Sequence, residues 1–126
     1  MKNEIKTRAD ISLLVRTFYN KVRKDETLGP FFNLTITDWP THFEHLTDFW
    51  GANLFGQTTF KGNPLAKHQK VDEKFNHCID SYHFGIWLNL WFQTLDELFE
   101  GDLVELAKYR ARKLGTILLL HLVRQR

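Results

Sequence analysis

The chain's six histidines hold most of its chemical potential, and they are His42, His45, His68, His77, His83 and His121. A neutral imidazole is the commonest metal ligand in proteins, and it can also move protons near pH 7. The sequence has no Gly-rich phosphate loop, no serine or cysteine with a nucleophile signature and no cysteine-rich zinc motif. The search for a functional site therefore starts from a metal or cofactor that a histidine could hold.

His42 and His45 form the first candidate pair. They stand three residues apart in a predicted helix, so both imidazoles could reach one zinc or iron ion. A good zinc site takes three or four protein ligands, and no acidic residue or further histidine, such as His83, is spaced to complete one. A metal site on this pair is therefore the weaker hypothesis.

His68 lies in a predicted short helix that follows a polar loop. Asn63 can cap this helix, Pro64 suits its first position, and Leu65 can pack inward beside the imidazole. The rest of the chain can be interpreted as a housing for this imidazole.

The composition fits a protein with a flat apolar ligand. Four Trp, three Tyr and eleven Phe make the chain rich in large rings. All of them can belong to the core, or a surplus can line a flat apolar ligand site. The 17 basic and 15 acidic residues leave a net charge of only +2. Electrostatics therefore gives no reason to propose nucleic acid as a partner.

The compartment follows from cysteine usage and hydropathy. Cys78 is the only cysteine, which excludes an internal disulfide and favours a reducing compartment. The amino terminus lacks the apolar core of a signal peptide, and the longest apolar run, at residues 117–123, is interrupted by His121 and too short to span a bilayer. We expect a cytoplasmic protein with no membrane partner.

The elements that position these side chains are expected to be helices. Asp10 caps a first helix that runs to about Asp25, because its apolar residues recur at spacings of three and four. The expected buried face comprises Ile11, Leu14, Val15, Phe18, Tyr19 and Val22. Gly29 and Pro30 then break the helical pattern and leave two phenylalanines in a tight corner.

Three further long helices are expected. One spans residues 38–56, from an aspartate cap to a terminating glycine, and presents an unusually aromatic face. A long helix spans roughly 80–100, with Tyr82 on its apolar face, and a glycine ends it. The last helix begins near residue 102, and Ile117 belongs to its expected apolar face.

Two connecting segments are less regular than the helices. A β-strand is indicated only weakly, at residues 58–60, and the charged segment 72–76 is expected to be exposed. The sequence contains no repeats, low-complexity tracts or linkers. Residues 1–126 are therefore expected to form one all-α domain.

Five segments, in order, resemble group III truncated haemoglobins. They read FYNKVR at 18–23, LGPFFN at 28–33, WPTH at 39–42 with FW at 49–50, PLAKH at 64–68 and HFGIWL at 83–88. The chain also lacks the paired glycines that groups I and II usually carry. The resemblance implies a truncated globin, a two-over-two helical sandwich, that holds haem b (iron protoporphyrin IX).

The resemblance also implies a role for individual residues. His68 would be the proximal iron ligand, and Tyr19, His42 and Trp87 would form the distal side of the pocket and act on the bound ligand. The residues expected to contact the porphyrin are Phe32, Leu46, Phe49, Trp50, Leu65 and Trp87. A buried hydroxyl and a buried indole each need a hydrogen-bond partner, and a small oxygen-containing ligand is a suitable acceptor.

Two hydrogen-bond donors would hold dioxygen too tightly for easy delivery, since each such bond contributes roughly 1.5–3 kcal/mol. The resemblance therefore favours chemistry on dioxygen, nitric oxide or peroxide, such as nitric oxide dioxygenase-like or peroxidase-like activity, over bulk oxygen transport. Carbon monoxide and cyanide would be further iron ligands. Either reaction needs a separate reductase, because the chain contains no reductase domain.

Other interpretations stay open at this point. The protein could be a diatomic-ligand sensor or scavenger without turnover, or a haem-free helical module that binds a metal or a partner. If the register of the resemblance slipped, His77 would be the nearest alternative iron ligand. The role of His42 as donor, proton relay or gate is open, and Lys67, Lys70 or Lys74 could pair with haem propionates.

Overall fold

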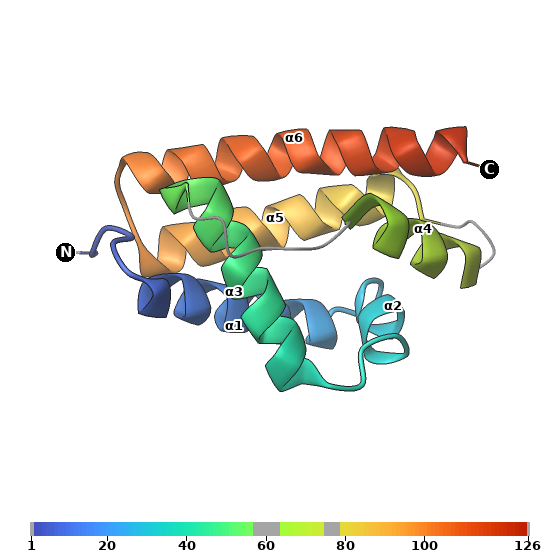
Figure 1. Ribbon diagram of the computed structural model, residues 1–126, viewed down its shortest axis with the longest axis horizontal. Coiled ribbons are helices and arrows are strands. Elements are labelled where there is room, and N and C mark those ends of the chain that lie inside the picture. Colours follow the sequence, from blue (N-terminus) through green and yellow to red (C-terminus); the bar gives the residue numbers. More distant parts are fainter. Residues whose placement is uncertain (1, 57–63, 75–78, 126) are drawn as a thin grey trace.

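The computed structural model describes residues 2–56, 64–74 and 79–125, and within 64–74 it describes the side chains of residues 68 and 70–74. Six α-helices follow one another in this part of the chain (Figure 1). They are α1 (Arg8–Lys24), α2 (Gly29–Asn33), α3 (Trp39–Phe55), α4 (Pro64–Lys74), α5 (Ser81–Leu98) and α6 (Asp102–Arg124).

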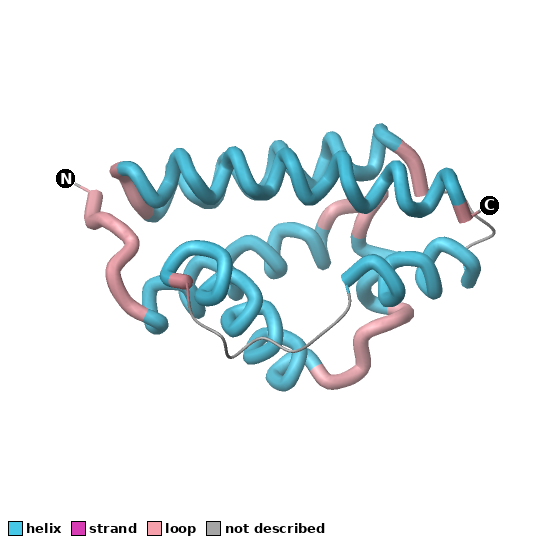
Figure 2. Tube along the Cα trace, turned by 45° about the horizontal axis from the view of Figure 1, so that its top comes forward, coloured by secondary structure: helices cyan, strands magenta, loops and turns pink. Residues whose placement is uncertain are grey.

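The four long helices pack in two pairs. The antiparallel helices α5 and α6 form one pair, and α3 crosses α1 in the other (Figure 1). Contacts of α1 with α5, and of α3 with α6, join the pairs, while α4 packs on α6 and α2 packs on α1. The described residues form no strand, which Figure 2 also shows, so the predicted all-α class is confirmed. The weak strand indicated at 58–60 lies outside the described residues.

The first helix has the predicted buried face but a different cap. Its six predicted core residues are all buried. Thr7, not Asp10, is the N-cap, and its hydroxyl accepts a hydrogen bond from the Asp10 backbone N–H at 3.2 Å. The Asp10 carboxylate accepts in return from the Thr7 backbone N–H at 3.0 Å. This is a reciprocal capping box, in which the acidic residue stands three positions after the cap.

The segment predicted as a break contains a short helix instead. The chain does break after α1, which ends at Lys24, but Gly29 and Pro30 then begin a second helix, because the first turn of a helix does not need the backbone N–H that proline lacks. Arg23 and Asn33 fasten this helix to α1: the Arg23 Nε donates to Asn33 Oδ1 at 3.1 Å, and Asn33 Nδ2 donates to the Arg23 carbonyl at 3.0 Å.

The caps of α3 agree with the prediction. Asp38 accepts a hydrogen bond from the Thr41 backbone N–H at 3.2 Å, and Gly56 ends the helix with a φ of 70°. A left-handed residue at this position favours glycine, since a Cβ would be strained there.

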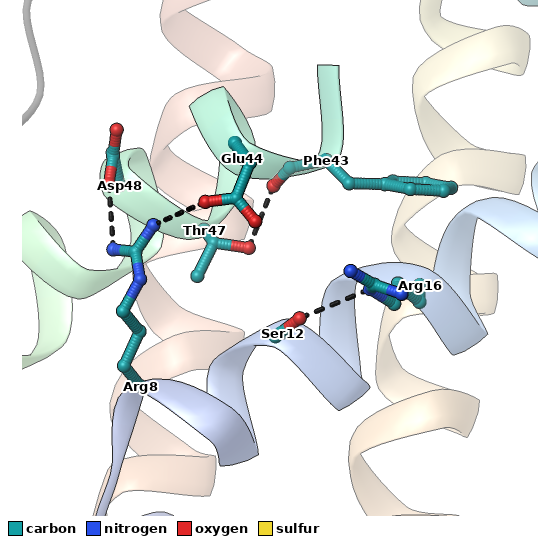
Figure 3. A network of polar contacts seen from close by, with 7 residues as sticks. All are labelled: Arg8, Ser12, Arg16, Phe43, Glu44, Thr47 and Asp48. Carbon is teal, nitrogen blue, oxygen red and sulfur yellow. Dashed lines mark hydrogen bonds and ion pairs between the residues drawn. The ribbon is translucent and has the colours of Figure 1, made fainter. Parts of the chain in front are cut away.

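An exposed ion-pair cluster connects α3 to α1 (Figure 3). The Arg8 guanidinium donates to Glu44 at 3.0 Å and to Asp48 at 2.7 Å. Behind it, the buried Thr47 hydroxyl donates to the Phe43 carbonyl at 2.7 Å, within the same helix. Because the Arg8 side chain is 45% exposed, solvent screening limits its contribution to roughly 1 kcal/mol or less.

The last two helices differ from the prediction at their ends and in one face. Asp80 caps α5 as expected, but α5 ends at Leu98, and Gly101 instead begins α6 with a φ of 107°. Tyr82 is 64% exposed in the first turn of α5, and Ile117 is 51% exposed on α6, so both predictions of burial were wrong.

Small residues explain the shifted face of α6. Its buried line is Val104, Ala107, Ala111, Gly115, Leu118 and Leu122. A Cβ on Gly115 would make ordinary contacts with α5, at 3.7 Å from Phe84 and 4.0 Å from Leu88, so this position faces α5. Ile117, one position before Leu118, consequently points about 100° away from the buried line.

The charged segment after His68 is more ordered than the sequence indicates. Helix α4 continues through Asp72 to Lys74, and Asp72 is buried with 2% exposure. Its carboxylate accepts a hydrogen bond from the Ile79 backbone N–H at 3.1 Å, which satisfies the donor where the chain enters α5. The prediction that Asp72 is exposed was therefore wrong.

Candidate functional site

A cavity of about 500 Å³ opens between the helices and is lined by residues from all six of them and their connections. This volume is typical of a site for a small organic ligand or cofactor. The lining residues are Tyr19, Leu28, Phe31, Phe32, Thr35, Ile36, His42, His45, Leu46, Phe49, Trp50, His68, Lys70, Val71, Lys74, Ile79, His83, Phe84, Trp87, Leu114 and Leu118. Most are apolar or aromatic, and none of these described residues is an aspartate or glutamate.

The cavity brings together nearly all residues that the sequence marks as candidates. His68 lines it from α4 and is half-buried, while Tyr19, His42 and Trp87 line it from α1, α3 and α5. The four expected porphyrin contacts on α2 and α3, which are Phe32, Leu46, Phe49 and Trp50, line it as well. The side chain of Leu65, and the whole of His77, lie outside the described residues.

The Trp87 indole lies beside the Tyr19 hydroxyl, where its N–H acts as a donor toward the hydroxyl oxygen and so favours the ionised form of Tyr19. Tyr19 is only 6% exposed, and this burial raises the pKa of its hydroxyl to about 12, although the bond from Trp87 acts in the opposite direction. The hydroxyl is therefore protonated at neutral pH. Because its oxygen accepts from Trp87, its own hydrogen can be donated elsewhere.

His42 packs edge-on against two aromatic rings. Its ring centroid lies 5.7 Å from that of Tyr19 at an interplanar angle of 84°, and 5.4 Å from that of Trp39 at 87°. The Arg23 guanidinium covers Trp39, with its central carbon 4.3 Å from the ring centroid. This packing places the imidazole beside the Tyr19 ring at the α1 side of the cavity.

Stacked tryptophans form a rigid wall behind the cavity. The Trp50 and Trp91 rings stack with centroids 4.5 Å apart, and Trp87 lies parallel to Trp91 at 6.4 Å. The Trp91 indole N–H donates to the Ala107 carbonyl at 3.3 Å, so its polar atom is satisfied within the core. Trp91 thus supports two lining residues, Trp50 and Trp87, without lining the cavity itself.

The remaining histidines do not gather into a metal site within the described residues, where no three His, Cys, Asp or Glu side chains converge. His83 belongs to the cap of α5: its Nδ1 lies 3.0 Å from the Asp80 backbone N–H and 3.0 Å from the Asp80 carboxylate. His45, the partner of His42 in the weaker metal hypothesis, is exposed but contributes to the cavity wall.

The comparison with known proteins decides the family. No family model matches the chain. The chain is 31% identical over 120 residues to the group 3 truncated hemoglobin ctb of Campylobacter jejuni subsp. jejuni, a match that covers 92% of this chain and 91% of that protein. This chain belongs to the group III truncated haemoglobins.

The tertiary structure agrees with that assignment. The crystal structure of a group III truncated hemoglobin from Campylobacter jejuni superposes with a TM-score of 0.85 at 31% sequence identity, covering 97% of this chain and 95% of the other. The predicted two-over-two truncated-globin fold is thereby confirmed. A truncated haemoglobin is a globin-type haem protein, and small gaseous molecules are the ligands of its iron.

The residues of this truncated haemoglobin fit a haem group. The cavity wall is mostly apolar and aromatic, as a porphyrin plate requires, and it includes the imidazole of His68 as a possible iron ligand. The hydroxyl of Thr35, at the same wall, is buried without a hydrogen-bond partner among the described residues. A ligand with polar groups would supply that partner.

Sequence reasoning missed several features of the site. Thr35 gives no signal, because a single threonine in a loop is indistinguishable from any other polar loop residue. Leu114 and Leu118 were expected only as core residues, yet they also line the cavity. Trp91 follows Trp87 by one helical turn, and this spacing could have indicated a supporting ring. None of the helices that the structure describes combines the length and hydropathy of a membrane-crossing segment.

Proposed function

We propose that this protein binds one haem b through His68 and acts on dioxygen, nitric oxide or peroxide, and that bulk oxygen transport is not its task. The observation that carries the proposal is the shared cavity: the His68 imidazole on α4, the buried Tyr19 hydroxyl and the Trp87 indole line the same mostly apolar space. Haem would supply an iron atom that binds small ligands, including carbon monoxide and cyanide, and that exchanges electrons.

The first task of the chain is to hold the cofactor and exclude water. His68 is the proposed iron ligand, and Phe32, Leu46, Phe49 and Trp50 supply the apolar contacts to the porphyrin. The stack of Trp91 against Trp50 keeps this wall in place. An enclosed apolar site strengthens each polar interaction inside it, because water no longer competes for the same groups.

The second task is to present one oriented hydrogen-bond donor to the small ligand. Tyr19 can donate its hydroxyl hydrogen into the cavity, while Trp87 fixes the position of the hydroxyl oxygen. A hydrogen bond to a charged or partly charged acceptor contributes roughly 1.5–3 kcal/mol, which slows ligand loss about tenfold or more. In this proposal Trp87 donates to the Tyr19 oxygen, and Tyr19 in turn donates to the small ligand.

Such a donor favours chemistry on the ligand, because it stabilises negative charge that develops on the ligand's outer atom. His42, beside the Tyr19 ring, is the proposed proton carrier or gate for the same side of the cavity. The electrons for turnover would come from a separate reductase.

An absorption titration tests the cofactor assignment. Equimolar haem should give a Soret band with the wild-type protein and a weaker, shifted band with His68→Ala. His121→Ala, on the last turn of α6 and not among the described lining residues, is the matched control and should give the wild-type Soret band. The absence of any Soret band in the wild type, or identical spectra for wild type and His68→Ala, would remove the haem assignment or its ligand.

Rapid mixing then tests the proposed chemistry. The oxygenated protein should form nitrate when mixed with nitric oxide, or the ferric protein should oxidise an added reductant steadily in the presence of peroxide. Tyr19→Phe should slow either reaction. If neither reaction turns over although haem is bound, the protein is a ligand-binding sensor or scavenger.

A further inference from the structure

Positive charge is concentrated in the last helix. Residues 106–126 contain six of the chain's 17 basic residues and none of its 15 acidic ones. The rest of the chain has 11 basic and 15 acidic residues, so it carries a net negative charge although the whole chain is at +2. The field of such an unevenly charged protein draws an acidic partner toward its basic side.

Three of these cations lie on the outer side of α6 without a compensating carboxylate. Arg8 and Lys21, on α1, each pair with a carboxylate at 2.7 Å. Arg112, Lys113 and Arg124 are exposed, in contrast, and pair with no carboxylate of the described residues. Their charge is therefore available to a partner.

Exposed aliphatic side chains share this side of the helix with the cations. Ile117, Leu120 and Val123 are half-exposed, and their spacing of three residues places them together. Lys113 stands one turn before Ile117, and Arg124 one turn after Leu120, so cations flank the apolar group at both ends. An apolar centre with a charged rim is typical of a protein–protein interface. These residues form the α6 face, which comprises Arg112, Lys113, Ile117, Leu120, Val123 and Arg124.

The opposite side of the same helix borders the candidate site. Leu114 and Leu118 line the cavity from α6, which runs along one edge of the molecule (Figure 1). An α-helix with its side chains is roughly 10–12 Å across. A partner on the α6 face would therefore be separated from the cavity by little more than one helix diameter. An electron can cross such a thickness of protein between two redox groups.

We propose that the α6 face is the docking surface for a one-electron carrier protein with an acidic surface around its redox group. The inference rests on the proposed function, which needs an external source of electrons. One electron leaves the reduced carrier, and the ferric haem iron accepts it and becomes ferrous. The small size of the α6 face suits such a partner, because weak electron-transfer complexes bury less than about 1,200 Å².

Two other occupants suit the α6 face less well. In a dimer of antiparallel α6 helices, Lys113 of one copy would lie near Arg124 of the other, and like charges that face each other weaken an interface. A helix that lies in a lipid surface presents a broad apolar side, whereas the α6 face has three aliphatic side chains between its cations.

A binding titration tests the surface, with flavodoxin, a small acidic flavoprotein, as the probe. Oxidised flavodoxin at low salt should shift the amide NMR signals of the haem-loaded protein around Leu120 and leave those of α1 unchanged. Lys113→Glu should weaken this binding about tenfold, and high salt should remove most of the difference from wild type. Lys24→Glu, the same charge change at an exposed position of α1, is the matched control and should bind as wild type.

The apolar part of the α6 face has its own control. Leu120→Ser should weaken flavodoxin binding several-fold at low and at high salt alike, because salt does not screen an apolar contact. Leu13→Ser changes a leucine on α1 with the same exposure, 49%, and should leave the affinity unchanged. An unchanged Soret band in all four variants shows that the cavity is intact.

The rate of electron transfer gives the second readout. Flavodoxin hydroquinone, mixed with the ferric protein in a stopped-flow instrument, should reduce it with a second-order rate constant that falls with added salt. Lys113→Glu should lower this constant about tenfold at low salt, and Lys24→Glu should not. Reduction by excess dithionite, a small inorganic reductant, should go to completion in every variant.

The outcomes separate this inference from the proposed function. A wild-type protein that takes up no haem contradicts the proposed function itself. Haem uptake without flavodoxin binding, or with binding and reduction that Lys113→Glu leaves unchanged, contradicts only the docking surface. Binding to phosphatidylglycerol vesicles that Lys113→Glu abolishes, without binding to flavodoxin, would also overturn it and assign the α6 face to a lipid surface.

Discussion

At the scale of single residues, the hydrogen bond between Trp87 and Tyr19 determines how the cavity can treat a small ligand. The indole N–H acts on the Tyr19 oxygen. We therefore propose that one donor is held by the other, where the sequence predicts two donors that act in parallel. A donor fixed in advance loses little conformational entropy when the ligand arrives, which increases its net contribution.

A double-mutant cycle distinguishes donors in series from donors in parallel. Tyr19→Phe should speed ligand loss about tenfold or more, and Trp87→Phe should speed it less. In the Tyr19→Phe background, Trp87→Phe should change the rate little, because the indole acts through the hydroxyl. Stopped-flow ligand replacement measures the rates, and resonance Raman spectra of the carbon monoxide complex report the polarity around the ligand. Additive effects of the two substitutions would indicate two independent donors.

The raised pKa of Tyr19 predicts a pH-dependent stability. In the unfolded chain a tyrosine titrates near 10, whereas in the folded protein its pKa is about 12. The stability that its neutral hydroxyl contributes is therefore fully present below pH 10 and is lost as the pH rises from 10 to 12, by an amount on the order of 2 kcal/mol.

Urea unfolding at pH 8 and at pH 11 measures this effect. Tyr19→Phe should lose less stability than wild type between the two values, because its ring has no proton to release. Tyr109→Phe, which changes an exposed ring on α6, should keep the wild-type difference. Equal losses for wild type and Tyr19→Phe would place the Tyr19 hydroxyl in contact with solvent.

At the scale of the helices, the sequence predicts best where periodicity and caps act locally. The buried face of α1, the Asp38 cap and the Gly56 terminus depend on residues within the same helix, and all three agree with the structure. Tertiary packing decides the rest: α2 forms because it is fastened to α1, and the face of α6 follows small residues that accommodate α5. The spacing of residues within one helix does not predict such contacts between helices.

The candidate site shows the same division between local and tertiary information. His68, Tyr19, His42 and Trp87 could be named from ordered motifs, and the fold places all four at one cavity. The tie between Lys74 and Leu34, and the unsatisfied hydroxyl of Thr35, arise only where the end of α4 meets the chain after α2. No pattern within either segment predicts that meeting.

Replacement of glycine by alanine should change the stability of the protein in opposite directions at two helical positions. A Cβ at Gly29 would lie 2.7 Å from the Arg23 carbonyl oxygen, which is backbone and cannot easily move, so Gly29→Ala should destabilise the protein by about 1–3 kcal/mol. A Cβ at Gly115 would make ordinary contacts at 3.7 Å and beyond, so Gly115→Ala should stabilise it by roughly 0.5–1 kcal/mol. Thermal and urea unfolding measure both, and the same sign for the pair would contradict this explanation.

At the scale of the whole molecule, the helices enclose the cavity unequally. The four long helices pack against one another, whereas α4 packs mainly on α6 and borders the cavity. An element with fewer protein neighbours has a lower local stability, and a ligand that contacts it adds to that stability.

Hydrogen exchange should therefore respond most strongly in α4. Addition of haem should slow amide exchange across residues 64–74 more than in the core of α1 or α5, and mass spectrometry of peptides can follow each segment. His68→Ala should lose most of this added protection while it keeps the exchange of α1 unchanged. Equal slowing in all helices would indicate that haem stabilises the fold globally and not through α4.

The arrangement of the four tryptophans has an optical consequence. Trp50 and Trp87 line the cavity, Trp91 stacks on both, and Trp39 contacts the rings of Tyr19 and His42. Indole emission overlaps the absorption of a porphyrin, so a haem in the cavity would quench all four by energy transfer. The intrinsic fluorescence of the purified protein would then report its cofactor content directly, without a label.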